Sequence, residues 1–173
     1  MRTLVTGGVR SGKSRHAESL LADAASVTYV AAGPTYDDAD WAARIAAHRE
    51  RRPAHWSTVE TTDVAGALRA AEGPVLVDCL GTWLTALIDE AALWEAPSEE
   101  VEQHVLTQVS ALVDAIGSTD GSVVLVTNEV GLGVVPEHRS ARLFRDLLGS
   151  TNQQVAAGCD EVHLVVAGRV LTL

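Results

Sequence analysis

The chain alternates between two kinds of hydrophobic pattern. Short apolar runs rich in β-branched residues, bounded by glycine, proline or acidic residues, predict strands. These runs lie at residues 3–6, 27–31, 56–60, 75–78, 123–126, 161–166 and 170–173. Longer stretches with apolar residues at helical spacing predict helices at 13–24, 40–51, 62–70, 79–90, 98–116 and 137–158.

This order of elements predicts an α/β fold. Strands that alternate with helices form a mostly parallel sheet with helices on both faces, here with 3–6 as a central strand and 170–173 as an antiparallel edge strand. The 173 residues show no internal repeat or linker, so we expect a single domain over 1–173. Ligands bind beyond the carboxyl ends of such strands, which places residues 7–14, 31–36, 78 and 128–129 at one edge.

The segment 7–14 fits the phosphate-binding P-loop pattern G-x-x-x-x-G-K-[ST] and stands between a predicted strand and a predicted helix. Its backbone N–H groups and the helix N-terminus suit phosphate oxygens. We expect Lys13 to reach the β- and γ-phosphates of a nucleotide and the Ser14 hydroxyl to bind Mg²⁺. Lys13 is the only lysine among 13 basic residues, which favours a specific role over a chance glycine-rich turn. The expected nucleotide-binding residues are Gly7, Gly8, Val9, Arg10, Ser11, Gly12, Lys13 and Ser14.

Asp78 closes the apolar run 75–78, and two roles are open to it. P-loop proteins use an acid at the end of a buried strand as a second carboxylate on the magnesium side, which makes Asp78 a candidate Mg²⁺ and nucleotide ligand. The alternative is that Asp78 only caps the helix that follows.

Composition excludes several other partners. A hydrophobic content of 47% and a charged content of 21% are ordinary for a globular protein. The net charge of −10 argues against nucleic acid or an anionic membrane as partner, and no apolar run reaches the ~18 residues of a membrane span.

Cys79 and Cys159 lack metal-site spacing and are expected to be reduced, buried thiols. A strand in place of a signal peptide at the N-terminus predicts a cytoplasmic location.

The predicted helix 40–51 crowds arginines around His48. Arg44, Arg49, Arg51 and Arg52 lie within nine residues, and Pro53 ends the helix. Guanidinium groups hold phosphate oxygens and keep a nearby imidazole neutral, and a neutral imidazole is a nucleophile. The alternative for His48 is a packed or surface histidine. Glu60, a little further on, can hydrogen-bond a base or a ribose.

Taken together, these motifs resemble one enzyme family, the bifunctional adenosylcobinamide kinase / adenosylcobinamide-phosphate guanylyltransferase of cobalamin assembly. The resemblance covers nearly the whole chain. Its generic part is the P-loop, and its specific parts are His48 with Arg52-Pro53 and the loop from Asn128 to Pro136. The remaining matching segments are Arg44-Ile45, Trp56, Glu60, Asp78-Cys79-Leu80, residues 126–128, Arg142, residues 144–146, Gly149, Asn152-Gln153 and residues 166–168.

The resemblance implies two reactions. ATP or GTP phosphorylates the terminal hydroxyl of the aminopropanol arm of adenosylcobinamide. GTP then transfers GMP to a histidine, here His48, and the GMP moves to adenosylcobinamide phosphate to give adenosylcobinamide-GDP. Lys13 and His48 would be the catalytic residues. Arg49, Arg51 and Arg52, with Pro53 in the same motif, would hold the triphosphate, and Glu60 would contact guanine or ribose. The family also implies a homo-oligomer, a trimer, with sites between subunits.

Three rival interpretations remain open. The chain can be a simple P-loop kinase of a small alcohol with a structural His48, a nucleotide-dependent switch, or a guanylyltransferase that has lost the kinase.

The sequence departs from the family pattern at two positions. Gly81 stands where a larger or β-branched residue is expected, and glycine is expected to loosen the start of the helix there. Trp41 replaces a more flexible apolar residue ahead of Arg44.

Overall fold

Seven strands form one sheet in the computed structural model, which describes residues 1–33, 43, 46, 50 and 52–173. The strands are β1 (Arg2–Thr6), β2 (Thr28–Ala31), β3 (Ser57–Glu60), β4 (Val75–Asp78), β5 (Val123–Val126), β6 (Glu161–Val166) and β7 (Arg169–Thr172). Their order is β3-β2-β4-β5-β1-β6-β7. All pairs are parallel except β6 with β7. The predicted antiparallel edge strand is confirmed, and β1 is an interior strand between β5 and β6.

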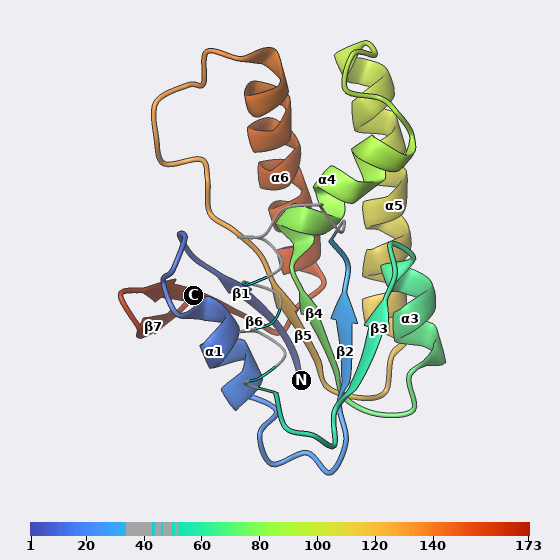
Figure 1. Ribbon diagram of the computed structural model, residues 1–173, viewed down its shortest axis with the longest axis vertical. Helices are drawn as coiled ribbons and strands as arrows, with labels where there is room; N and C mark the ends of the chain where they lie inside the picture. Colours follow the sequence, from blue (N-terminus) through green and yellow to red (C-terminus); the bar gives the residue numbers. More distant parts are fainter. Residues whose placement is uncertain (34–42, 44–45, 47–49, 51) are drawn as a thin grey trace.

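Helices cover both faces of the sheet, as predicted (Figure 1). The described helices are α1 (Lys13–Ser19), α3 (Val64–Ala70), α4 (Leu80–Glu90), α5 (Ser98–Ser118) and α6 (Arg139–Ala157). Helix α1 lies on one face, and α3, α4, α5 and α6 lie on the other. The four-helix face carries the larger of the two hydrophobic clusters.

Alternate residues of each strand supply the two clusters. Val75 and Val77 of β4 face α3 to α6, whereas Leu76 between them faces α1. The same alternation holds along β5 and at Leu4 and Val5 of β1, because successive strand side chains point to opposite faces. Both sides of the central strands are therefore buried, which is why their sequences are continuous apolar runs.

The first helix is shorter than predicted. It ends at Ser19, and the chain continues through residues 20–24 as turns with i→i−3 bonds from Leu21 to Glu18 and from Ala22 to Ser19. The predicted helix 40–51 lies almost entirely outside the described residues. Cys79 and Cys159 are free thiols, but both are half-buried rather than buried. Within the described residues, no helix combines the length and apolar character needed to cross a membrane.

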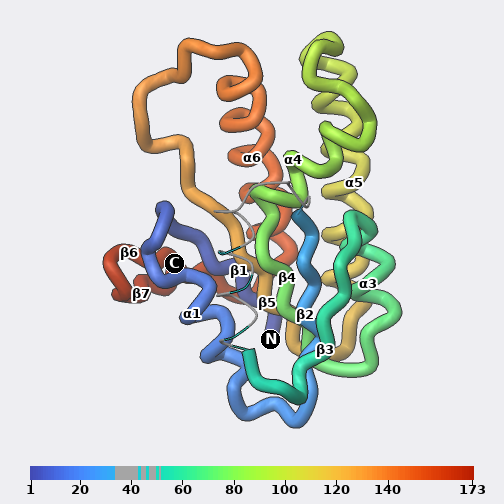
Figure 2. Tube along the Cα trace, in the orientation of Figure 1, coloured from blue at the N-terminus to red at the C-terminus, as the bar shows by residue number. Residues whose placement is uncertain are grey.

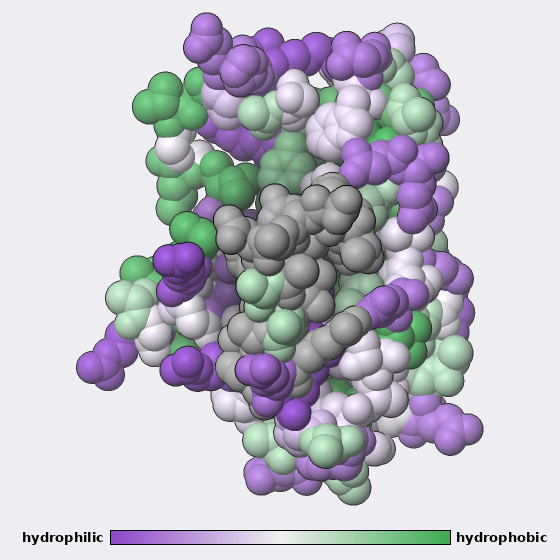
Figure 3. Space-filling model, viewed as in Figure 1, coloured by the Kyte–Doolittle hydropathy of each residue, from purple (hydrophilic) through white to green (hydrophobic). Residues whose placement is uncertain are grey.

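The connection from β5 to α6 extends away from the sheet (Figure 2). Its tip carries apolar side chains that face solvent: Leu132 is 91% exposed and Val134 is 94% exposed. In the space-filling view an apolar patch lies over this segment (Figure 3). The connection begins at the carboxyl edge of the sheet, beside the P-loop, because the N–H of Glu129 donates to the carbonyl of Gly7 at 3.2 Å.

Candidate functional site

The P-loop joins β1 to α1 with a backbone that depends on its glycines. Gly12 has φ 98°, and a Cβ at Gly7 would lie 2.4 Å from the Val165 carbonyl oxygen. Arg10, at φ 55°, also adopts the left-handed conformation. Lys13 is only 6% exposed, and its Nζ donates to the Gly8 carbonyl at 3.2 Å. The ammonium group is therefore held inside the loop, where a phosphate would bind.

Ser11 links the P-loop to the β6–β7 turn and carries a buried hydroxyl group. Its carbonyl accepts from the N–H of Gly168 at 2.8 Å, which ties the loop to the β6–β7 turn. Within the part of the chain that the structure describes, its buried hydroxyl has no hydrogen-bond partner. A buried hydroxyl without a partner is costly, and a phosphate oxygen would satisfy it.

Asp78 ends β4 and is linked to β2. The hydroxyl of Tyr29 donates to Asp78 Oδ2 at 3.2 Å. Burial, and then the charge of Asp78, raise the pKa of Tyr29, so the hydroxyl stays protonated as a donor. Cys79, not Asp78, occupies the N-cap position of α4, and the Cys79 side chain makes no capping hydrogen bond.

Arg52 lies over the ring of Tyr29, with its Cζ 3.4 Å from the ring centroid. Its NH1 also donates to the Thr58 hydroxyl at 3.0 Å. This cation–π contact and hydrogen bond fix the guanidinium group. Tyr29 thus brings together two residues that were predicted separately, Arg52 and Asp78, although Tyr29 itself was not among the predicted site residues.

Glu60 is further away along the same edge. It is the last residue of β3, exposed, at the end of the sheet. Four strand steps separate β3 from β1, which is about 19 Å at ~4.8 Å a step. The predicted residues that the structure describes therefore form a row along the carboxyl edge, with the P-loop near one end and Glu60 at the other.

His48, Arg49 and Arg51 lie outside the described residues. Pro53 is half-buried, and its carbonyl accepts from the N–H of Trp56 at 3.0 Å.

A polar network, not predicted from the sequence, fills the end of β5. The hydroxyl of Thr127 donates to Asn152 Oδ1 at 2.6 Å, and Asn152 Nδ2 donates to the Asn128 carbonyl at 3.1 Å. The Cys79 thiol donates to Asn128 Oδ1 at 3.5 Å. A Cβ at Gly81 would lie 2.6 Å from the same oxygen. In this chain the Asn128 side chain occupies the space that a larger side chain at 81 would need.

A second unpredicted cluster ties α1 to β6. His16 Nε2 and His163 Nδ1 lie 2.9 Å apart, and His163 Nε2 lies 3.0 Å from Glu161 Oε2. Burial, and then the neighbouring His163, lower the pKa of His16. No sequence signal indicated this pair, because 147 positions separate the two histidines.

The candidate magnesium ligands are oxygen donors. Ser14 supplies a hydroxyl on the first turn of α1, and Asp78 supplies a carboxylate at the end of β4. Mg²⁺ prefers such donors and is typically held by one or two protein ligands together with substrate phosphates. Across the described residues, no group of three or more His, Cys, Asp or Glu side chains could hold a metal ion. The donor set therefore fits a magnesium ion that binds with a nucleotide.

Sequence comparisons identify relatives over the full length of the chain. Residues 3–173 match the family described as cobinamide kinase / cobinamide phosphate guanyltransferase. The chain is 46% identical to a bifunctional adenosylcobalamin biosynthesis protein, CobU, of Escherichia coli K12, with 97% of each chain covered. It is 43% identical to the protein of that name from Salmonella typhimurium, again with 97% of each covered. It is 40% identical to a bifunctional adenosylcobalamin biosynthesis protein, CobP, of Pseudomonas aeruginosa, with 100% of this chain and 97% of the relative covered.

Solved structures with a similar fold include ATPases of type III secretion systems. One, a prototypical ATPase from pathogenic bacteria, superposes with a TM-score of 0.58 at 12% identity, covering 94% of this chain. The assembled ATPase EscN of enteropathogenic E. coli gives 0.55 at 12% identity, covering 96%. The chain spans 50% and 43% of these ATPases, and at this identity the similarity shows a P-loop ATPase fold alone.

Proposed function

The chain belongs to the cobinamide kinase / cobinamide phosphate guanyltransferase family, and on that premise we propose how its residues divide the work of the two reactions. Both activities belong to the assembly of cobalamin. The P-loop serves phosphoryl transfer, and the row from Arg52 to Glu60, with His48, serves guanylyl transfer.

In the kinase reaction the P-loop holds the phosphates of ATP or GTP. The acceptor hydroxyl of adenosylcobinamide attacks the γ-phosphorus and gives up its proton to solvent. The bond between the γ-phosphorus and the bridging oxygen breaks, and the nucleoside diphosphate leaves. Lys13 and the loop N–H groups stabilise the charge of the transferred phosphoryl group. Ser14 and Asp78 would hold Mg²⁺, which neutralises charge on the phosphates when it is bound.

In the guanylyltransferase reaction an imidazole nitrogen of His48 attacks the α-phosphorus of GTP. A phosphorus–nitrogen bond forms and pyrophosphate leaves. A phosphate oxygen of adenosylcobinamide phosphate then attacks the same phosphorus, the phosphorus–nitrogen bond breaks, and adenosylcobinamide-GDP results. Arg49, Arg51 and Arg52 hold the triphosphate, and Glu60 contacts guanine or ribose. The motif His48 with Arg52-Pro53 supports this assignment, as does the fixed position of Arg52 over Tyr29.

The observation that carries the kinase half is the buried position of Lys13, whose Nζ lies inside the P-loop. We expect Lys13→Met to lower phosphorylation of adenosylcobinamide by about 10²- to 10³-fold, as loss of one charge-stabilising donor does. We expect His48→Ala to spare phosphorylation and to abolish GMP transfer to adenosylcobinamide phosphate. Chromatography of the corrinoid products separates the two activities.

The same assay decides between the rival functions. Phosphorylation without GMP transfer in the wild-type protein would indicate the simple kinase, and GMP transfer without phosphorylation would indicate a guanylyltransferase that has lost the kinase. GMP transfer by His48→Ala at the wild-type rate would exclude His48 as the guanylyl carrier. Nucleotide hydrolysis without either corrinoid product would indicate a switch.

We also propose that the chain assembles into a homo-oligomer, a trimer by family resemblance. The exposed apolar tip at Leu132 and Val134 supports this, because large exposed apolar patches are typical of interaction surfaces. Light scattering in solution tests it, and the mass of a single chain would contradict it.

A further inference from the structure

A pocket lies between α4, α6 and the β5–α6 connection, and we propose that it binds one edge of the corrin ring of the acceptor during phosphoryl transfer. This inference rests on the proposed function. It goes beyond that function by assigning residues to the macrocycle rather than to the nucleotide.

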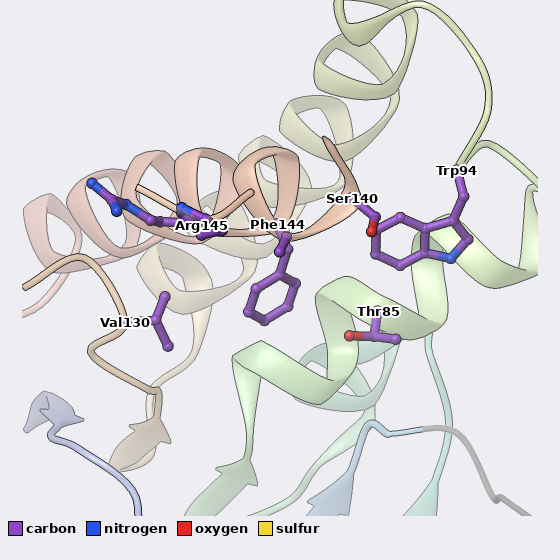
Figure 4. A pocket seen from close by; sticks show the side chains of 8 residues that line it. Thr85, Trp94, Val130, Ser140, Phe144 and Arg145 are labelled. Carbon is purple, nitrogen blue, oxygen red and sulfur yellow. The ribbon is translucent and has the colours of Figure 1, made fainter. Parts of the chain in front are cut away.

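The pocket has a volume of about 480 Å³ and mainly apolar walls. Figure 4 shows Phe144 projecting from α6 into the space above α4, with Val130 to one side and Ser140 and Trp94 to the other. Thr85, Ala141 and Arg145 also line the pocket.

Two segments of the chain lead from the phosphate site to the pocket. Glu129, which donates to the carbonyl of Gly7 in the P-loop, is directly followed by Val130, which lines the pocket. On the other wall, α4 begins next to Asp78 and contacts Asn128 through Gly81. The acceptor hydroxyl must come within roughly 3–3.5 Å of the phosphorus to react. A ring held by one edge in this pocket would direct its hydroxyl-bearing arm along the carboxyl edge, toward the P-loop.

The lining suits a large ring with apolar surfaces and amide arms. Trp94 and Phe144 offer aromatic surface, and small-molecule sites combine such surface with a few polar groups that fix orientation. The Thr85 hydroxyl donates to the Gly81 carbonyl at 3.2 Å and keeps lone pairs that can accept from an amide. The walls are mainly apolar, and the one guanidinium group among them, that of Arg145, balances little of the charge of a triphosphate. The acceptor is therefore a better occupant than a second nucleotide.

Arginines of α6 hold the walls of the pocket in place. Arg139 donates to the carbonyls of Trp94 at 2.6 Å and Ala96 at 2.5 Å, on the α4–α5 side. Arg142 donates to the carbonyls of Pro136, at 3.1 Å, and Glu137, and Arg145 donates to that of Gly133 at 3.3 Å. These bonds pre-form the site, so binding costs little ordering of the chain.

Substitutions that narrow the pocket and leave the P-loop unchanged test this proposal. Ala141→Trp fills it from its α6 wall, and Ser140→Trp, at an exposed position, does so with less risk to folding. Ala157→Trp, exposed at the far end of α6, is the matched control. We would measure the Kd for adenosylcobinamide and for ATP by calorimetry, the KM of phosphorylation for each substrate, and the oligomer mass by light scattering.

We expect both pocket variants to raise the Kd and the KM for adenosylcobinamide by about tenfold or more, a loss that a blocked subsite readily produces. The values for ATP should stay within about twofold of wild type, and the control should behave as wild type. Unchanged adenosylcobinamide binding in a folded Ser140→Trp would overturn the inference while leaving the proposed function intact. A change of oligomer mass in the pocket variants would also overturn the inference, because it would show that a second copy of the chain covers the pocket. A wild-type protein that cannot phosphorylate adenosylcobinamide would instead refute the proposed function.

Discussion

Tyr29 makes two contacts that can be separated experimentally. Its hydroxyl donates to Asp78, and the face of its ring carries the guanidinium group of Arg52. Phenylalanine keeps the ring and removes only the hydroxyl. The Tyr29 side chain is almost fully buried, and phenylalanine preserves the packing of its ring. The substitution therefore tests what the hydrogen bond to Asp78 contributes to the orientation of that carboxylate.

We predict that Tyr29→Phe raises the Mg²⁺ concentration needed for half-maximal phosphorylation by about five- to tenfold. A hydrogen bond to a charged group contributes about 1.5 kcal/mol or more, and a less ordered Asp78 would hold Mg²⁺ more weakly. Excess Mg²⁺ should restore the maximal rate. Thr62→Val is a matched control, since it removes a hydroxyl-to-carboxylate bond to Glu90, 3.0 Å long, away from the site. A Tyr29→Phe protein that is slower at every Mg²⁺ concentration would contradict this role for Asp78.

At the scale of single elements, α1 is fixed at its start and at its middle. Its first turn continues from the P-loop, and His16 pairs with His163 on β6. Burial and the neighbouring His163 hold the pKa of His16 below its usual 6.5. The unfolded chain therefore takes up more protons as the pH falls through 6.5, and the free energy of unfolding falls with it.

We predict that His16→Gln reduces the loss of stability between about pH 7.5 and about pH 5.5. The free energy of unfolding, measured with a denaturant at both pH values, tests this prediction. His138→Gln, at an exposed position, is the control. Equal losses in wild type and His16→Gln would show that this histidine does not contribute to the pH dependence.

Helices α4 and α6 each contain a glycine, but in opposite surroundings. Gly81 faces the Asn128 amide, whereas a Cβ at Gly149 would meet nothing within 4 Å. Alanine normally stabilises a helix relative to glycine by roughly 0.5–1 kcal/mol. We predict that Gly149→Ala raises the free energy of unfolding by this amount. We predict that Gly81→Ala lowers it by about 1–3 kcal/mol, because the new methyl group displaces the Asn128 amide. Urea unfolding measures both, and a stabilised Gly81→Ala would refute the packing explanation.

At the scale of the whole molecule, local patterns in the sequence predicted the fold well. The run 123–126 coincides with β5, because a strand buried on both faces is a continuous apolar segment. The run 161–166 coincides with β6, in which only His163 and Val165 are buried. The end of α1 was missed, since a turn of i→i−3 bonds keeps Leu21 and Ala24 packed against the same cluster as a longer helix would.

The site was predicted only in part, because several of its contacts join distant segments. Lys13 and Asp78 follow from motifs that stand directly after strands. The Tyr29 link and the contact of Gly81 with Asn128 depend on the order of strands in the sheet. The pocket depends on how α4, α6 and the β5–α6 connection pack together. No spacing in the sequence encodes such long-range neighbours.

The most direct measurement is incubation with GTP labelled at the α-phosphate and Mg²⁺, without a corrinoid acceptor. Wild-type protein should gain a covalent label that is stable in base and labile in acid, as expected for a phosphorus–nitrogen bond to His48. His48→Ala should gain none. His55→Ala, which changes the histidine just past Pro53, should label as wild type. Absence of label from a wild-type protein that binds GTP would contradict the covalent guanylyl-histidine and leave the kinase as its supported chemistry.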